Sequence, residues 1–417
     1  MLRRSLLPTL AIVISISSFA QQTSRTAYAI TGGQKGEFNW AEVHLIDLNT
    51  GEVVKSVYEK NSQPQIINAR TGKPISFKKE LENSRQSNNS PFSTLSAACA
   101  YDKKHNRLYY TPMGINQLRY IDLNAEDPKI FYFENEPFGS VTSLKDEANH
   151  ITRMVIGSDG HGYALSNDAK HLIRFTTGRK PVITDLGNLV DDPNNKDVSV
   201  HLRCSSWGGD MVADAFGKLY LISARQAVFV IDVESRIATY KGYIEGLPGN
   251  YTTNGAVVDG DGNVIVSSAN SVNAYYTVDL NTLKATAIKA KEKVFNTSDL
   301  ANGNLALQKE ADKKASAVSA AQVDRRDLIR NEHVTIYPNP VTEGNFRMYF
   351  KDQQLGKYEI QLVDLTGRII SSKAISVVNK VQVEEVQVQD NLARGLYLVK
   401  LVGGNKRATF ADRILVQ

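Results

Sequence analysis

The sequence contains few cysteines and little excess charge of either sign. Its 417 residues include only two cysteines, Cys99 and Cys204, so at most one disulfide can form within the chain. In the repeat described below they fall on non-adjacent units, which favours two small buried apolar residues and leaves a bridge as the alternative. The chain carries 49 Lys and Arg against 44 Asp and Glu. This small excess gives no reason to expect a nucleic-acid partner.

The sequence also lacks an apolar run long enough to cross a bilayer, so no transmembrane segment is predicted. The run from Leu6 to Ser18 is far shorter than the roughly 20 residues that a spanning helix needs, and no later segment approaches that length. It follows Arg3 and Arg4, and Ser18-Phe19-Ala20 offers small residues at the two positions that a signal peptidase reads. We therefore predict a signal peptide at residues 1–20 and a mature chain that begins at Gln21.

No catalytic or metal-binding motif is complete. The seven histidines include no pair at metal-ligand spacing on one element, and no Gly-x-Ser-x-Gly motif occurs. Asp259-Gly-Asp-Gly-Asn263 resembles the start of a calcium-binding EF-hand loop, but Val264 replaces the required glycine and Asn270 the required glutamate. We read this stretch as a hairpin turn. No catalytic residue, metal site or cofactor is predicted, and calcium is kept as the alternative cofactor.

What the sequence does contain is a repeat from about Arg25 to Leu307. One unit is an aspartate, a short turn with Gly or Asn, and an apolar strand. Its five copies begin at Asp102, Asp159, Asp214, Asp259 and Asp299. A second unit, an apolar strand that ends in a polar turn, recurs at 44–51, 120–124, 173–178, 230–235 and 277–282. Because an Asx side chain at a hairpin corner bonds the backbone two residues on, we predict that the aspartates fix turns.

Each pair of units supplies two hairpins in series, which is how the blades of a β-propeller are built. We predict an all-β fold with a five-bladed propeller at residues 25–307. Four blades are complete, at about 95–135, 151–187, 207–246 and 252–290, and a composite blade joins 27–30, 42–49 and 53–58 to the last strands near 296–307. Six blades are the alternative, because the strands at 27–30 and 304–307 fit the same slot in different blades. The architecture resembles quinoprotein-like and lactonase-like surface propellers.

Residues 334–417 predict a second, smaller β domain. Runs such as 358–364 and 381–388 largely alternate apolar and polar residues, which is typical of strands with one solvent-exposed face. The segment Tyr337-Pro338-Asn339-Pro340 marks a strand end or edge, because neither proline has an amide hydrogen for a sheet ladder. About seven short strands in roughly eighty residues predict a small Ig-like β-sandwich.

Four motifs follow one another in this domain: Tyr337-Pro338-Asn339-Pro340, Asp364-Leu-Thr-Gly367, Leu392-Ala-Arg-Gly395-Leu-Tyr397 and the terminal apolar strand at 413–417. In this order they resemble the type A C-terminal sorting domain of the type IX secretion system, although Arg413 stands where the family usually has lysine. The resemblance implies recognition by the type IX secretion and sorting machinery, passage across the outer membrane and removal of the domain. It also implies a secreted protein or one attached to the outer-membrane surface. An ordinary Ig-like module is the alternative.

Between the two domains, residues 308–332 are rich in Ala, Lys, Asp and Arg and predict a solvated, partly helical linker. A protease that removes the sorting domain needs such an exposed segment. We therefore predict cleavage between Gln308 and Val334.

One face of the predicted propeller carries the long insertions, at 60–94, 136–150 and 187–206. We call it the insertion face; it is formed by the loops between the second and third strands and by those between blades. Its aromatic and cationic side chains are candidates for binding, because Trp, Tyr and Arg dominate binding hot spots. The candidate ligand-binding residues are Trp40, Arg70, His201, Arg203, Arg225 and Tyr251, with Phe38 and Trp207 beside them. Packing within the blades is the alternative for each and is preferred for Trp207.

These features predict a secreted or cell-surface β-propeller that binds an unknown extracellular protein or glycan and is sorted through its C-terminal domain. A calcium-dependent hydrolase or lyase on a lactonase-like propeller is the alternative, since single residues from several blades can form a site without a sequence motif. A structural component of a surface or biofilm matrix is a third reading.

Overall fold

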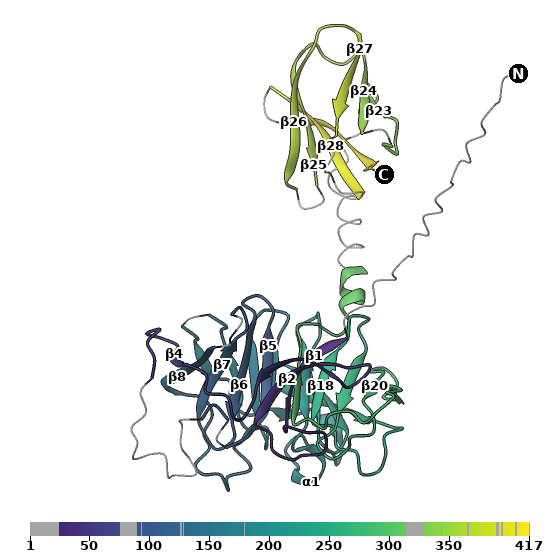
Figure 1. Cartoon of the computed structure of the whole chain (residues 1–417). Helices are drawn as coiled ribbons and strands as arrows, with labels where there is room; N and C mark the ends of the chain where they lie inside the picture. The colour runs from purple at the N-terminus through teal and green to yellow at the C-terminus, as the bar shows by residue number, and fades with distance from the viewer. Residues whose placement is uncertain are drawn as a thin grey trace, which may run out of the picture. The chain divides into compact units, whose positions relative to one another are not determined.

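The computed structural model describes residues 25–75, 90–92, 94–125, 127, 129–178, 180–313, 329, 331–342, 344–364, 367–388, 392, 395–404 and 407–416. The predicted signal peptide lies outside these residues. The chain forms two compact units, Met1–Gln308 and Lys309–Gln417 (Figure 1). Among the described residues, no helix has both the length and the apolar character that a membrane span requires.

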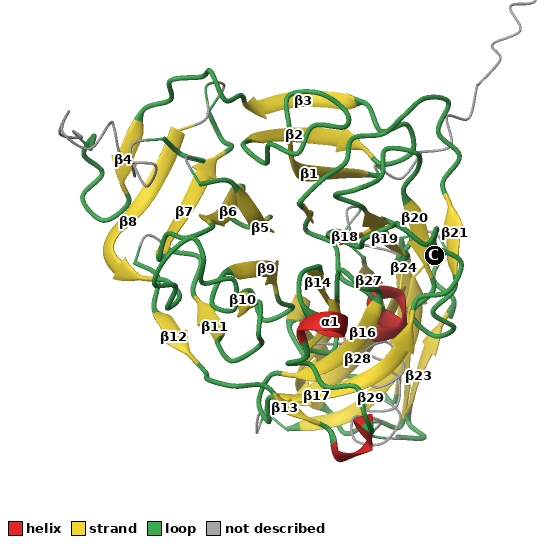
Figure 2. Cartoon of the chain, turned by 90° about the horizontal axis from the view of Figure 1, so that it is seen from below, coloured by secondary structure: helices red, strands yellow, loops and turns green. Residues whose placement is uncertain are grey.

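The first unit is a β-propeller of five blades around one axis (Figure 2). The inner strands contact one another in a closed ring, in the order β22, β5, β9, β14, β18 and back to β22. The five-bladed prediction is therefore confirmed, and the six-bladed alternative is wrong. Residues 304–307 add only an isolated bridge, between Ala306 and Asp214.

The first blade is composite, as predicted. It consists, from axis to rim, of β22 (Asp299–Ala301), β1 (Thr26–Thr31), β2 (Glu42–Asp47) and β3 (Val53–Tyr58). β1 pairs antiparallel with β22, with Ala29 opposite Leu300, so the two ends of the propeller sequence share one sheet. This pairing closes the ring.

The other four blades follow in sequence order. The second consists of β5 (Ser96–Asp102), β6 (Arg107–Pro112), β7 (Gln117–Asp122), β8 (Lys129–Pro137) and β4 (Ile66–Asn68). The third consists of β9 (Ile151–Ile156), β10 (Gly162–Ser166), β11 (Leu172–Phe175) and β12 (Ile183–Asp185). The fourth consists of β14 (Asp210–Ala213), β15 (Lys218–Ile222), β16 (Ala227–Asp232), β17 (Ile237–Tyr243) and β13 (Val190–Asp191). The fifth consists of β18 (Gly255–Val258), β19 (Val264–Ser267), β20 (Tyr276–Val278) and β21 (Ala285–Ala287).

Two of the predicted insertions contribute strands as well as loops. The 60–94 insertion supplies β4, which runs parallel to β8 at the rim of the second blade. The 187–206 insertion supplies β13, which runs parallel to β17 at the rim of the fourth blade, and then η2 (Pro193–Asn195) and α1 (Arg203–Ser206). These additions cover the outer edges of two blades.

The turns confirm most of the predicted role of the repeated aspartates. Four of them accept a hydrogen bond from the amide two residues on: Asp102, Asp159, Asp214 and Asp259. The hairpin reading of 259–263 is confirmed, because this stretch joins the antiparallel strands β18 and β19 and the amide of Asp259 donates to the carbonyl of Asn263 at 2.9 Å. The fifth prediction is wrong, because Asp299 lies buried at the start of β22 and Asn302 makes the turn by accepting from the amide of Asn304.

The second unit is a sandwich of two antiparallel sheets. One contains β23 (Val334–Tyr337), β24 (Asn345–Lys351) and β27 (Val381–Gln387). The other contains β26 (Ile369–Val377), β25 (Gly356–Val363), β28 (Gly395–Gly403) and β29 (Ala408–Val416). Alternate residues of the strands, such as Phe346, Met348 and Phe350, fill one core between the sheets. The predicted Ig-like sandwich is therefore confirmed.

Candidate functional site

The inner strands pack closely around the axis of the propeller. One pocket between them has a volume of only about 20 Å³, and its wall includes Ala100, Tyr101, Met154 and Asn302. A volume of this size holds about one water molecule. This pocket is therefore too small for a substrate.

Beside the axis, Asp210, Asp299 and Arg153 are fully buried charged residues of the inner strands. Arg153 donates to four backbone carbonyls: those of Gly208 at 3.0 Å, Ser166 at 2.8 Å, Asn167 at 3.2 Å and Ser206 at 2.6 Å. Two of these carbonyls lie in or just after α1, which is near the axis in Figure 2. Arg153 thus fixes α1 and the turn that follows it.

The two carboxyls beside the axis have perturbed pKa values. Burial raises the pKa of Asp299 well above its ordinary value, and the nearby charge of Asp210 raises it further. Burial likewise raises the pKa of Asp210, although hydrogen bonds from the amides of Ala256 and Met211 oppose the shift.

Both cysteines are free, so no disulfide forms between them. Cys99 is buried beside these carboxyls, whereas Cys204 is exposed on α1, so the predicted burial of Cys204 is wrong.

Two of the predicted ligand-binding residues, His201 and Arg203, gather around α1 together with Trp207. The guanidinium of Arg203 lies 5.2 Å from the centre of the Trp207 ring and pairs with Glu147 at 2.5 Å. The indole of Trp207 donates to the carbonyl of His201 at 3.1 Å. Both ring nitrogens of His201 face backbone carbonyls, at 2.7 and 3.2 Å. Arg203 is exposed, while His201 and Trp207 are half-buried and support the loop.

Of the other predicted residues, Arg225 lies next to this group, because the amide of Ala224 donates to the carbonyl of Trp207 at 3.3 Å. Arg70 pairs with Glu136 beside β4 and β8, at the rim of the second blade. Trp40 is half-buried with Phe38 beside it, and Arg225 is exposed. Tyr251 is buried, and its hydroxyl lies within hydrogen-bond distance of the carbonyls of Val266 and Ala274, so the expected exposure of Tyr251 is wrong.

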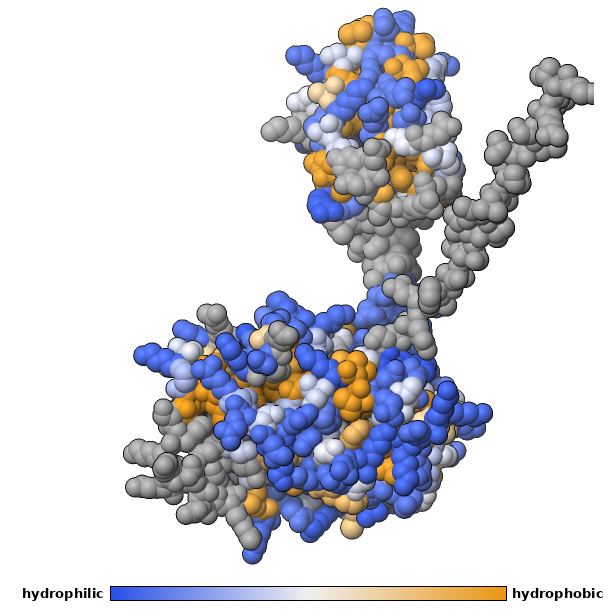
Figure 3. Space-filling model, in the orientation of Figure 1, coloured by the Kyte–Doolittle hydropathy of each residue, from blue (hydrophilic) through white to orange (hydrophobic). Residues whose placement is uncertain are grey.

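A pocket that the sequence did not indicate opens at the rim, between the composite blade and the second blade. We call it the rim pocket. It has a volume of about 570 Å³ and is lined by Ser56, Val57, Tyr58, Glu59, Ser62, Gln63, Pro64, Gln65, Ile121, Asp127, Lys129 and Ile130. Its size is typical of pockets that bind ligands. Figure 3 shows apolar surface and a hollow on the side of the propeller where β2 and β8 lie in Figure 1.

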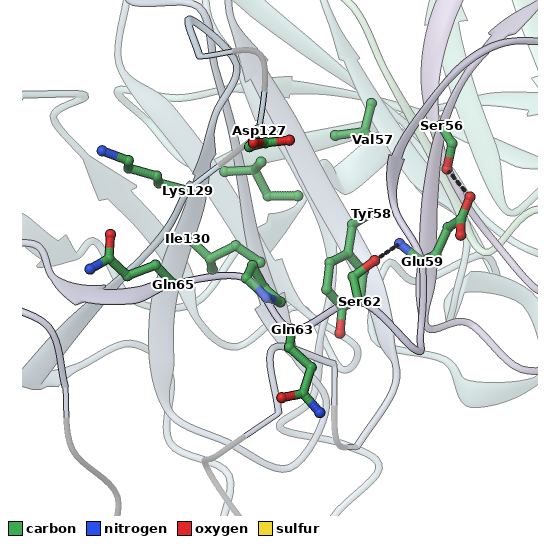
Figure 4. Close-up of a pocket in the computed structure, with 12 residues that line it drawn as sticks. Ser56, Val57, Tyr58, Glu59, Ser62, Gln63, Gln65, Asp127, Lys129 and Ile130 are labelled. Atoms are coloured by element: carbon green, nitrogen blue, oxygen red, sulfur yellow. Dashed lines mark hydrogen bonds between the residues drawn. The ribbon is translucent and has the colours of Figure 1, made fainter.

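Polar groups border this pocket and aliphatic groups form its floor. Figure 4 shows Lys129 and Gln65 on one side and Ser56, Glu59 and Ser62 on the other, with Ile130 between them. The hydroxyl of Ser56 donates to Glu59 at 2.9 Å, and the amide of Glu59 donates to Ser62 at 3.2 Å. Two carboxylates, Glu59 and Asp127, therefore accompany one lysine.

The wall of the rim pocket is braced by aromatic stacking. The ring of Tyr58 stacks on Phe92 at 5.1 Å, and Phe92 stacks on Tyr110 at 4.4 Å. Behind them, the fully buried Arg119 lies 3.8 Å from the centre of the Tyr132 ring and donates to the carbonyl of Pro91 at 2.6 Å. Burial raises the pKa of Tyr58, so its phenol stays neutral at physiological pH. The pocket is thus preformed on a rigid wall.

The second unit brings its sequence motifs together. Asn339 of the Tyr-Pro-Asn-Pro motif donates to the carbonyl of Arg413 at 2.8 Å and accepts from the amide of Leu415 at 2.9 Å. Val341 bridges to Val416 in the same strand. The first and last of the four motifs therefore form one structural element. In the turn between β25 and β26, the side chain of Asp364 accepts from the amide of Arg368, and its backbone carbonyl accepts from the amide of Gly367.

This domain matches a known family. Residues 335–417 are a secretion system C-terminal sorting domain. The predicted resemblance is confirmed, and the sorting domain indicates export through type IX secretion and a secreted or outer-membrane surface location. No curated protein matches the chain.

Solved structures resemble the chain at low similarity. One is PorZ, an essential bacterial surface component of the type-IX secretion system of Porphyromonas gingivalis. It is 15% identical to this chain with a TM-score of 0.31, and the match covers 94% of this chain and 51% of PorZ. The chain thus spans about half the length of PorZ. Virginiamycin B lyase from Staphylococcus aureus is 11% identical with a TM-score of 0.32, and the match covers 94% of this chain and 96% of the lyase. A chain of the nidogen/laminin complex is 12% identical with a TM-score of 0.34, and the match covers 66% of this chain and 97% of that one.

Proposed function

We propose that this chain is an exported propeller that binds an extracellular protein or glycan, and that the rim pocket is its binding site. The observation that supports the proposal is the pocket itself, about 570 Å³ in volume and set on a braced aromatic wall. A preformed pocket loses little conformational entropy when a ligand binds. The sorting domain delivers the propeller to the outside of the cell, where such a ligand is met.

The composition of the pocket suits a ligand with both apolar and polar groups. Val57 and Ile130 offer aliphatic contact, and Gln63, Gln65 and Lys129 offer hydrogen-bond donors at its border. The calcium-dependent hydrolase or lyase would need room for an ion and a substrate, and the pocket between the inner strands has a volume of only about 20 Å³. The geometry therefore favours binding at the rim over chemistry at the axis.

The proposal is tested with the full chain immobilised against arrays of bacterial glycans and of peptides. The variant Glu59→Ala, Gln63→Ala, Lys129→Ala removes the polar border of the rim pocket and is expected to weaken binding of the captured probe at least about tenfold. A matched variant, Ser158→Ala, Phe216→Ala, Glu234→Ala, alters another inter-blade pocket and is expected to bind normally.

A third variant, Trp40→Ala, Arg203→Ala, Arg225→Ala, alters the insertion face. If it abolishes binding while the rim-pocket variant binds normally, the ligand site is the insertion face and the rim-pocket proposal is wrong. The same measurement therefore compares both surfaces directly.

A further inference from the structure

The outer edges of the five blades differ in how they are protected. β8 and β17 are covered by β4 and β13. β12 and β21 are only three residues long, and Lys284 next to β21 bridges to Glu245. Short or covered edges give another chain little to pair with. β3 is different, because it is six residues long and is the last strand of its sheet among the described residues.

The first half of β3 is exposed. Val53 and Val54 are 39% and 57% exposed. The pairing with β2 shifts register between Leu45 and Ile46, so Val54 lies at a β-bulge of this edge. The second half differs, since Val57 and Tyr58 are buried and line the rim pocket. The exposed edge therefore leads directly into the pocket.

The chain shows what covers such an edge in this fold. β4 and β13 are short extended segments that pair in parallel with an outer strand. They carry β-branched aliphatic residues, Ile66 and Ile67 in β4 and Val190 in β13. Both come from segments between blades. The composite blade has the same outer edge without such a strand among the described residues.

We propose that β3 is a docking edge for an extended segment of another extracellular protein, which pairs in parallel as a further strand of the composite blade. This inference rests on the binding function proposed above and names the ligand as a polypeptide. Main-chain hydrogen bonds to β3 supply affinity, and the rim pocket supplies specificity, as in other cases of strand addition.

The surroundings of β3 define the chemistry of the segment. Valine, isoleucine or threonine at successive positions would cover Val53 and Val54. A parallel segment enters the rim pocket with its C-terminal half, because β3 runs from Val53 toward Glu59. Glu59 and Asp127 outnumber Lys129 there, so a Lys or Arg in that half is favoured by charge.

The probe is a phage-displayed library of random heptapeptides, selected on the full chain. We expect enrichment of peptides with β-branched residues followed by a basic residue. With the selected peptide bound, the amides of 53–58 should exchange hydrogen more slowly. Val54→Pro removes one amide of β3 and is expected to weaken binding at least about tenfold, whereas Val54→Thr keeps the amide and the strand propensity and weakens it less. Equal binding by wild type and Val54→Pro would overturn the proposal.

A second test leaves the protein unchanged. A strand pairs through alternate amides, so N-methylation of the selected peptide at one set of alternate residues should abolish binding, and methylation at the other set should preserve it. Equal effects of the two sets would overturn strand pairing. If the rim pocket captured a glycan and no peptide were enriched, the proposed binding function would stand and this inference would be overturned. Concentration-dependent protection of 53–58 without peptide would overturn it in favour of a second copy of the chain.

Discussion

The thiol of Cys99 donates a hydrogen bond to Oδ1 of Asp299 at 3.2 Å, where the inner strands β5 and β22 adjoin. Both side chains are fully buried, and Oδ2 of Asp299 has no hydrogen-bond partner among the described residues. An unpartnered carboxylate oxygen in this position is costly when the group is charged. The pair therefore makes the stability of the propeller sensitive to pH.

We expect Asp299→Asn to reduce the loss of stability that sets in as the pH rises above about 4. Burial, and then Asp210, raise the folded-state pKa of Asp299, so the native state holds a proton that the unfolded chain releases near pH 4. The stabilising contribution is complete below the unfolded pKa and is lost as pH rises through the folded pKa. The asparagine does not titrate. Since both tryptophans, Trp40 and Trp207, lie in the propeller, their fluorescence during urea unfolding measures this unit. An undiminished pH dependence in the variant would contradict the prediction.

Gly255→Ala is expected to destabilise the propeller by about 1–3 kcal/mol. A Cβ at Gly255 would lie 2.4 Å from Oγ of Ser267 and 2.9 Å from the amide nitrogen of Leu300, where inner strands crowd the axis. Gly249→Ala is the matched control, because nothing lies within 4 Å of its Cβ position. Urea unfolding followed by tryptophan fluorescence compares them. Equal free energies of unfolding for the two variants would show that the axis has room to adjust.

Asp214→Ala is expected to cost about 1–2 kcal/mol, and Asp214→Asn less. The buried carboxylate accepts from the amides of Phe216 at 2.8 Å and Lys218 at 2.9 Å, and alanine leaves both amides without this acceptor. Asparagine keeps one side-chain oxygen for the turn. The free energy of unfolding of the propeller measures the difference. If both variants lost the same stability, the carboxylate charge rather than the turn geometry would be its source.

The secreted form is expected to end between Gln308 and Val334. Residues 308–313 are helical, and the predicted cleavage region continues largely outside the described residues. Removal of the sorting domain there would leave the complete propeller, whose last strand is β22. Intact mass measurement of the protein recovered from the medium or the cell surface checks this. A mass that still includes Gln417 would contradict cleavage.

The repeat predicted the blades well because each blade encodes its own turns. Asp102, Asp159, Asp214 and Asp259 act locally, within a few residues of their partners, so the local sequence reports them. Asp299 has the same sequence pattern but lies at a point where distant strands meet. A local sequence pattern cannot show whether such an aspartate makes a turn or begins a strand whose partner comes from the other end of the propeller sequence, as β1 does for β22.

The rim pocket could not be predicted for the same reason. Its walls come from 56–65, where the sequence predicts the end of a strand and the start of an insertion, and from 121–130 in the next blade. Exposure was also misjudged where a residue type suggested a surface role. Tyr251 has the composition of a binding hot spot, yet its hydroxyl meets two backbone carbonyls in the interior. The exposed edge beside the rim pocket does have a local sequence signal, which is the pair of adjacent valines Val53 and Val54 in the outer strand β3.

The composite blade imposes an order on folding. β1 is synthesised first among the strands of the propeller, yet its partner β22 is the last, so the ring stays open until the whole propeller sequence is present. Contacts between such distant segments form slowly, because loop closure must precede them. Until then, the edges of β1 and of the last inner strands are free to pair with other chains. Ring closure therefore leaves the propeller without these free inner edges only once the chain has been made as far as Ala301.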